Sequence, residues 1–235
     1  ADVVLLVSAN QRVLTNGKYS HRLADPLSRE LRLRNLMTLV WEEGEVTPRS
    51  GPSAWINAAL RKELRSMAHQ AMPAVPIWFS DFQHVCSDLF AVPPPTWEQL
   101  WNRTISGVLN RADVFERWLR CVKAKAVISE CWYSPERMAL TLAAKRLGLR
   151  TVEWQHGWEA QSHCSYNGWT CCPKGGYEVM PDLFWMWGDR DTSSFLHNNR
   201  LPVQAIAGGH LHLNEATGRS PGESRKFNGS TSTGP

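Results

Sequence analysis

The stretch KAVISECWYSPERMALTLAAKRLGLRTVEWQHGWE, residues 125–159, has the pattern strand, helix, strand. Ser134 and Pro135 form a typical helix start, because serine caps a helix N-terminus and proline suits the first helical position. Leu147 and Gly148 form a typical helix end, because glycine adopts the left-handed conformation that follows many helices. Two strands joined by one helix predict a βαβ unit with parallel strands and a right-handed crossover.

Further elements surround this unit on both sides. Additional strands are predicted in residues 1–10, in 36–44 (LMTLVWEEG), in 74–82, which Pro76 interrupts, in 182–187, and in 203–210 running on to His212. Helices are predicted over 27–35, over 53–70, and from a Thr96 N-cap to about Val122 with a break near Asn110. A shorter one follows Asp191 or Thr192 and reaches about Asn199. The fold class is therefore α/β, a Rossmann-like parallel sheet with helices on both faces, over residues 1–212. Residues 213–235 are polar and predict a disordered tail.

Composition limits the possible classes of protein. The chain has 235 residues and a net charge of +4, too small an excess to indicate nucleic-acid binding. It contains no apolar run long enough to span a membrane and no signal peptide. The six cysteines form no CxxC pair, which favours a reduced, cytoplasmic protein. Zinc bound by Cys164, Cys171, Cys172 and His163 is a less favoured alternative, because vicinal cysteines rarely share one closed site.

Polar residues follow the two strands of the βαβ unit. In open α/β sheets, ligands bind outside the carboxyl ends of the strands, where Glu130 and the group Gln155, His156, Gly157 are expected to lie. The histidine could act as a general base, donate to a phosphate or satisfy a backbone carbonyl. Gly157 would allow a ligand to approach the backbone closely.

Twelve tryptophans are an unusually high number for this length. An indole ring suits the C–H face of a sugar as well as a protein core, and core packing is the more common role. Trp132 and Trp158 are the candidates for sugar contacts because they lie beside the predicted site.

Three further patterns have competing interpretations. Asp189 and Asp191 could hold a divalent cation, but Asp191 is equally a helix cap. His210 and His212 would share one face of a strand, without an evident third metal ligand. Gly208-Gly209 would allow phosphate approach, which is a weak signal without a full glycine-rich motif.

The order of these segments resembles one family of enzymes. A strand, a Ser-Pro helix, a strand ending in QHG, the loop SYNGWTCCPKGGY, then MPDLFWMWGDRD and a strand ending in glycine are similar to bacterial surface-polysaccharide glycosyltransferases of the GT-B fold. The likeness is greatest to those that transfer 3-deoxy-manno-octulosonic or sialic acid, and it covers residues 125–212. It implies an acceptor-side Rossmann-like half with the interdomain connection near residues 181–212. It also implies an early acceptor loop that contains Asn16, Gly17, Tyr19, His21 and Asp25.

The resemblance implies a transfer reaction and its partners. A sugar would pass from a nucleotide-activated donor to a polysaccharide or lipopolysaccharide acceptor with inversion, without a metal or another cofactor. Glu130, His156 and Asp25 are the candidates for the base, and the substrate-binding candidates are Gln155, Gly157, Trp158, Glu159, Trp132, Tyr19, His21 and Asn16. We expect no nucleic-acid partner, and a cytoplasmic protein that could reach the inner face of the inner membrane through its acceptor.

One departure from this family favours an alternative function. The polar tail takes the place of the second domain, so a C-terminal donor-binding half is expected to be missing from this chain. The alternative is therefore a non-catalytic carbohydrate- or nucleotide-binding module of a larger assembly.

Overall fold

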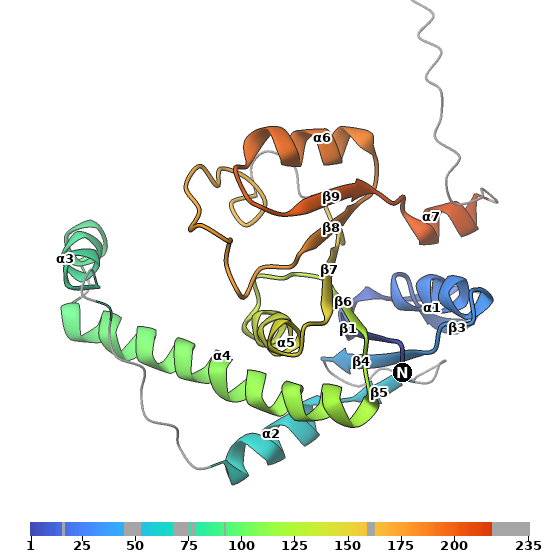
Figure 1. Cartoon of the computed structure of the whole chain (residues 1–235), viewed down its shortest axis with the longest axis horizontal. Helices are drawn as coiled ribbons and strands as arrows, with labels where there is room; N and C mark the ends of the chain where they lie inside the picture. Colours follow the sequence, from blue (N-terminus) through green and yellow to red (C-terminus); the bar gives the residue numbers. More distant parts are fainter. Residues whose placement is uncertain are drawn as a thin grey trace, which may run out of the picture.

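The protein is built on a seven-stranded sheet in which every pair of neighbouring strands is parallel (Figure 1). The computed structural model describes residues 1–15, 17–44, 53–67, 76, 79–91, 93–158 and 163–217. In spatial order the strands are β5 (Ser53–Trp55), β4 (Thr38–Glu43), β1 (Val3–Ser8), β6 (Ala126–Ser129), β7 (Arg150–Trp154), β8 (Leu183–Met186) and β9 (Gln204–Ala207). This order confirms the predicted α/β, Rossmann-like class.

Helices cover both faces of the sheet. Residues in strands point alternately to opposite sides, and in β1 both sets of side chains are apolar. Val4 and Leu6 of β1 pack with α2 (Asn57–Ser66), α4 (Pro94–Val122) and α5 (Pro135–Arg146). Leu5 and Val7 face the other way, where the core also contains residues of α1 (Ala24–Leu33) and α7 (Leu211–Ala216). A third apolar cluster joins α6 (Asp189–Asn198) to β8.

The βαβ unit has the predicted form. The Ser134 hydroxyl accepts a hydrogen bond from the Arg137 backbone N–H, and Gly148 after the helix has a φ of 67°. β6 and β7 are adjacent and parallel, with Ser129 level with Glu153. The residues that follow both strands therefore emerge at one edge of the sheet.

The chain reverses its direction of winding between β1 and β6. From β1 it passes through α1 to β4 on one side, whereas from β6 it passes through α5 to β7 on the other side. In open α/β sheets, ligands bind beyond the carboxyl ends of the strands at this kind of switch point. Ser8 and Glu130 are the residues that flank it here.

Several predicted elements were wrong where tertiary packing overrides local pattern. Residues 11–21, for which no strand was predicted, contain an antiparallel hairpin of β2 (Arg12–Thr15) and β3 (Lys18–His21). Ser53–Trp55 is a strand rather than the start of a helix, because it pairs with β4. The strand predicted over 74–82 is wrong at its end, because Phe79–Phe90 forms helix α3 and packs its aromatic side chains on α4.

Two predicted helix starts and one predicted strand end were also wrong. α4 begins at Pro94, after the N-cap Pro93, and runs without a break past Asn110. Gly188, rather than Asp191 or Thr192, is the N-cap of α6. His210 and His212 do not alternate along a strand, because α7 begins at Leu211 and the His210 ring accepts the Leu213 N–H. The predicted tail lies outside the described residues from residue 218 onward.

Helices long and apolar enough to cross a bilayer are not found in the described part of the chain.

Candidate functional site

Polar and charged side chains gather where the central strands end. β4 ends in Glu42 and Glu43, β1 ends in Ser8, and β6 is followed by Glu130. β7 continues into Gln155, His156 and Gly157. Because all these strands are parallel, their ends lie along the same edge of the sheet, which we call the carboxyl edge.

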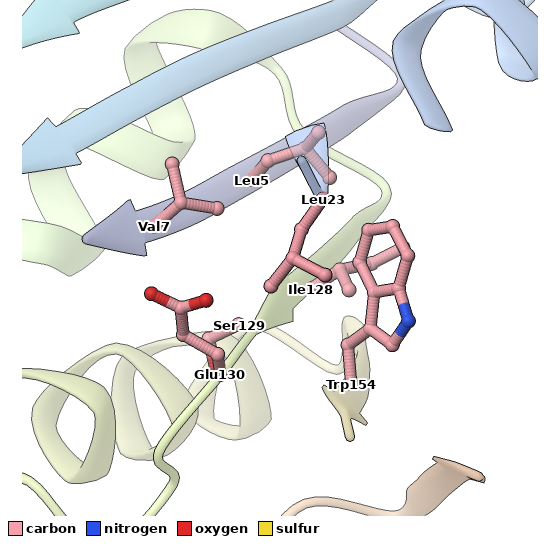
Figure 2. Close-up of a pocket in the computed structure, with 7 residues that line it drawn as sticks. All are labelled: Leu5, Val7, Leu23, Ile128, Ser129, Glu130 and Trp154. Carbon is pink, nitrogen blue, oxygen red and sulfur yellow. The ribbon is translucent and has the colours of Figure 1, made fainter. Parts of the chain in front are cut away.

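Glu130 is buried at the switch point between β1 and β6. Its side chain lies in a narrow, mostly apolar gap that is too small to hold a water molecule, and Figure 2 shows its carboxylate directed toward Val7. The carboxylate Oε1 accepts the Ser8 backbone N–H at 2.6 Å. Only 1% of Glu130 is exposed, so this candidate base is closed off from solvent. The carboxylate instead joins the ends of β1 and β6.

Arg137 supplies a buried positive charge to this edge. It lies in the first turn of α5 and forms an ion pair with Glu43, and its Nη2 lies 3.9 Å from Glu130 Oε1. Burial lowers the pKa of Arg137 to about 10, although the charge of Glu153 opposes this shift. The guanidinium therefore remains charged at neutral pH and stabilises the carboxylates around it.

Two of the early-loop candidates, His21 and Asp25, form hydrogen bonds at the start of α1. His21 Nε2 lies 3.0 Å from the Ser8 carbonyl oxygen, and its Nδ1 accepts the backbone N–H groups of Leu23 and Ala24. The Asp25 carboxylate in turn accepts the backbone N–H of His21 at 2.8 Å. These contacts resemble a helix capping box, in which two side chains satisfy exposed backbone donors reciprocally.

Tyr19 lies half-buried in β3, and Asn16 lies outside the described residues.

Gln155 is buried and bonded within the protein. Its side-chain oxygen accepts the Trp187 backbone N–H at 2.6 Å, and its amide nitrogen donates to the Gly157 carbonyl and to Asp191. Its own backbone carbonyl accepts the Trp187 indole N–H. These bonds join the end of β7 to the segment between β8 and α6.

His156 is half-buried as a residue, although its Nδ1 atom is buried. Its Nε2 lies 3.0 Å from Cys131 Sγ, and its backbone carbonyl accepts a hydrogen bond from Arg22. A Cβ added at Gly157 would meet nothing within 4 Å, which leaves open space beside the backbone. Trp158 is 82% exposed, and Glu159 lies outside the described residues.

The two candidate tryptophans differ in their surroundings. Trp132 is buried, donates its indole N–H to the Ser165 carbonyl and packs against Trp169. Its ring is therefore part of the core, whereas the Trp158 ring is available to a ligand.

Other motifs have structural roles. A Cβ at Gly208 would lie 2.1 Å from the Trp185 ring, and the Trp185 indole donates to the Gly209 carbonyl, so these two glycines accommodate that ring. Asp191 accepts a hydrogen bond from Gln155. Within the described ranges, no three His, Cys, Asp or Glu side chains are grouped in a way that could hold a metal ion.

Sequence reasoning missed the partners of the predicted residues. Arg137, Arg22 and Cys131 contact the carboxyl edge but carry no motif of their own. Tyr166 was missed as well, and its hydroxyl donates to the buried Glu153 carboxylate at 2.6 Å. The available signal was position, since Cys131 directly follows Glu130 and Arg137 lies in the first turn after Ser134.

No family model and no curated protein matches the sequence. Solved structures with similar backbones include MnaA of S. aureus with UDP, at TM-score 0.46 and 9% identity, covering 96% of this chain and 49% of that chain. UDP-GlcNAc 2-epimerase from Neisseria meningitidis bound to UDP-GlcNAc matches at TM-score 0.46 and 12% identity, covering 92% and 49%. MurG of Acinetobacter baumannii matches at TM-score 0.35 and 11% identity, covering 81% and 42%. The chain spans about half the length of these structures or less. The description of its fold rests on its own strand order and register.

Proposed function

We propose that this chain is the acceptor-side half of an inverting glycosyltransferase of the GT-B type. It would act on a nucleotide-activated sugar and a polysaccharide or lipopolysaccharide acceptor. The observation that carries this proposal is the half-buried His156 at the end of β7, next to the open space at Gly157 and the exposed ring of Trp158. Close backbone approach and a flat apolar face suit the binding of a sugar, and a base suits its transfer.

In this proposal His156 removes a proton from an acceptor hydroxyl. The resulting oxygen attacks the anomeric carbon, and the nucleotide leaves with the electrons of the broken bond. His156 takes precedence over Glu130 and Asp25 because Glu130 is buried and the Asp25 carboxylate already accepts the His21 N–H. Donor specificity for an acidic sugar such as 3-deoxy-manno-octulosonic or sialic acid belongs to the same proposal.

A non-catalytic carbohydrate- or nucleotide-binding module is the second candidate. The observation that favours it is that Glu130, Gln155, His21 and Asp25 are all hydrogen-bonded within the protein. Such a module would use Trp158 and Gly157 to hold its ligand and would perform no chemistry.

The test combines binding and turnover on the purified chain. Acceptor oligosaccharides are titrated by calorimetry with UDP- and CMP-sugars present, and released nucleotide is measured in the same samples. We expect Trp158→Ala to weaken acceptor binding by roughly threefold to tenfold, because an aromatic contact contributes about 0.5–1.5 kcal/mol. Phe90→Ala is the matched control, because it removes another exposed aromatic ring, on α3.

The outcomes separate the candidates. Nucleotide release that His156→Gln abolishes supports transfer. Binding that Trp158→Ala weakens, without release, shows that this chain alone performs no transfer and favours the binding module. No binding of any sugar or nucleotide contradicts both.

A further inference from the structure

Cys131 occupies a sharp turn between a strand and a helix. It lies one residue beyond Glu130, and its φ of 54° is in the left-handed region that residues other than glycine rarely adopt. Its carbonyl accepts the Ser134 N–H at 2.8 Å, and α5 begins at Pro135. A strained turn from strand to helix is also how α/β-hydrolases expose their nucleophile. Such residues cluster at functional sites, although Asn35, Ala91 and Lys123 share this conformation, so the turn alone does not identify a site.

A base lies within reach of this thiol. His156 extends from the neighbouring strand β7, and its Nε2 lies 3.0 Å from Cys131 Sγ. Arg22 donates to the His156 carbonyl at 3.0 Å, which fixes the backbone that carries the ring. A nucleophile and a base in hydrogen-bond contact are the minimum arrangement for nucleophilic catalysis.

The charges nearby suit proton transfer to His156. The Tyr166 ring lies 6.5 Å from the His156 ring, and its hydroxyl is bonded to the Glu153 carboxylate. Glu130 precedes the cysteine, and Arg137 partly balances these carboxylates. The N-terminal end of α5, where the helix dipole is positive, follows the same turn and favours a thiolate at Cys131.

We propose that Cys131 and His156 form a nucleophile–base pair that reacts with electrophilic carbon. The sulfur attacks the carbon and a bond from sulfur to carbon forms. The leaving group departs with the electron pair of the broken bond, and the thiol proton passes to His156 Nε2. This reaction uses the same imidazole as the proposed sugar transfer, but alkylation of Cys131 can be measured whether or not the chain transfers sugar.

Iodoacetamide is the probe for this reaction. It alkylates the thiol with loss of iodide, and mass spectrometry of the digested protein measures the rate at each cysteine. Cys121 and Cys171 are exposed and serve as internal references, whereas Cys131 is half-buried. Burial alone would make Cys131 the slower site. We expect it to react at least about tenfold faster than Cys121, since general-base assistance typically contributes roughly 10²–10⁴-fold.

Two variants identify the role of the imidazole. His156→Gln should reduce the rate at Cys131 to that of Cys121 or below it. His163→Gln is the matched control, because His163 packs against Tyr166 at the same edge and its Nδ1 accepts the Ser165 N–H instead. This control should leave the rate at Cys131 unchanged.

The unmodified chain keeps the proposal falsifiable if a variant fails to fold. In urea the rates at Cys131 and Cys121 should become equal, because the contact with His156 is lost on unfolding. The proposal is overturned if Cys131 reacts no faster than Cys121 in the native protein, or if folded His156→Gln protein keeps the fast rate.

Discussion

His21 shows how one residue can couple a helix start to pH. Its Nδ1 accepts two backbone N–H groups at the beginning of α1, and only an unprotonated nitrogen can do so. Burial lowers the pKa of His21 below its usual 6.5, although the Ser8 carbonyl opposes this shift. The unfolded chain therefore takes up a proton first as the pH falls, which favours unfolding.

We predict that His21→Asn flattens the pH dependence of stability. An asparagine oxygen can still accept an N–H at a helix start, but it does not titrate. At pH 7 the free energy of unfolding of the variant should be lower than that of the wild type by about 1–2 kcal/mol, because the hydrogen bond to the Ser8 carbonyl is lost. As the pH falls from 6.5 to 5, the free energy of unfolding, measured in urea, should decrease less for the variant than for the wild type. His210 also makes the protein less stable as the pH falls, because burial lowers its pKa too. Equal slopes for the two proteins would show that His21 is not the titrating group.

The same residue marks a limit of sequence reasoning. His21 and Asp25 are polar residues in a long connection, and that pattern is common to ligand-binding loops and to helix caps. The partner that distinguishes the two roles is the Ser8 carbonyl, thirteen residues away. No local spacing encodes this contact. The exposure of Trp158 was equally beyond the sequence, whereas the edge on which it lies was predictable from the βαβ unit.

At the level of elements, one ion pair holds the β2–β3 hairpin against the sheet. Arg12 on β2 donates to both carboxylate oxygens of Glu42 on β4, and Ser53 on β5 donates to the same carboxylate. The side chains of Arg12 and Glu42 are 5% and 3% exposed. Burial alone would raise the pKa of Glu42, but the hydrogen bonds from Arg12 and Ser53 outweigh it and the pKa is lowered.

We predict that breaking this pair from one side costs more than removing it. Arg12→Leu leaves a buried carboxylate without its cation and should destabilise the protein by about 3–5 kcal/mol. The double variant Arg12→Leu, Glu42→Leu should recover a large part of that loss, because no charge remains to be buried. Urea unfolding of the four proteins of the double-mutant cycle measures the coupling. Additive effects of the two substitutions would contradict a direct interaction.

Elements with local signals were predictable, and elements defined by distant partners were not. The α5 boundaries follow from Ser134, Pro135 and Gly148, which act on the backbone next to them. Ser53–Trp55 is a strand only because β4 lies beside it. Phe79–Phe90 is a helix whose Phe79 packs against Trp101 of α4, and a short aromatic run alone cannot be distinguished from a strand.

For the molecule as a whole, α3 stands apart from the core. Figure 1 shows it at the N-terminal end of α4, away from the sheet. Of the described residues of α3, Phe79 and Cys86 are buried, and neither belongs to the three apolar clusters around the sheet. Phe79 packs instead against Trp101 of α4, with ring centroids 4.9 Å apart. Its exposed side includes Phe82, Val85, Leu89 and Phe90.

This separation predicts that α3 opens without global unfolding. Segments with few buried apolar contacts exchange their amide hydrogens at lower free energy than core strands. Phe79→Ala should therefore accelerate exchange in α3, by removing a contact of about 3–5 kcal/mol, and leave β1 and β6 unchanged. Mass spectrometry of peptides after exchange in deuterated buffer measures both regions. Leu89→Ala, which shortens a side chain that is 71% exposed on the same helix, is the control and should change α3 far less. Equal acceleration in α3 and β1 would mean that both unfold as one cooperative unit.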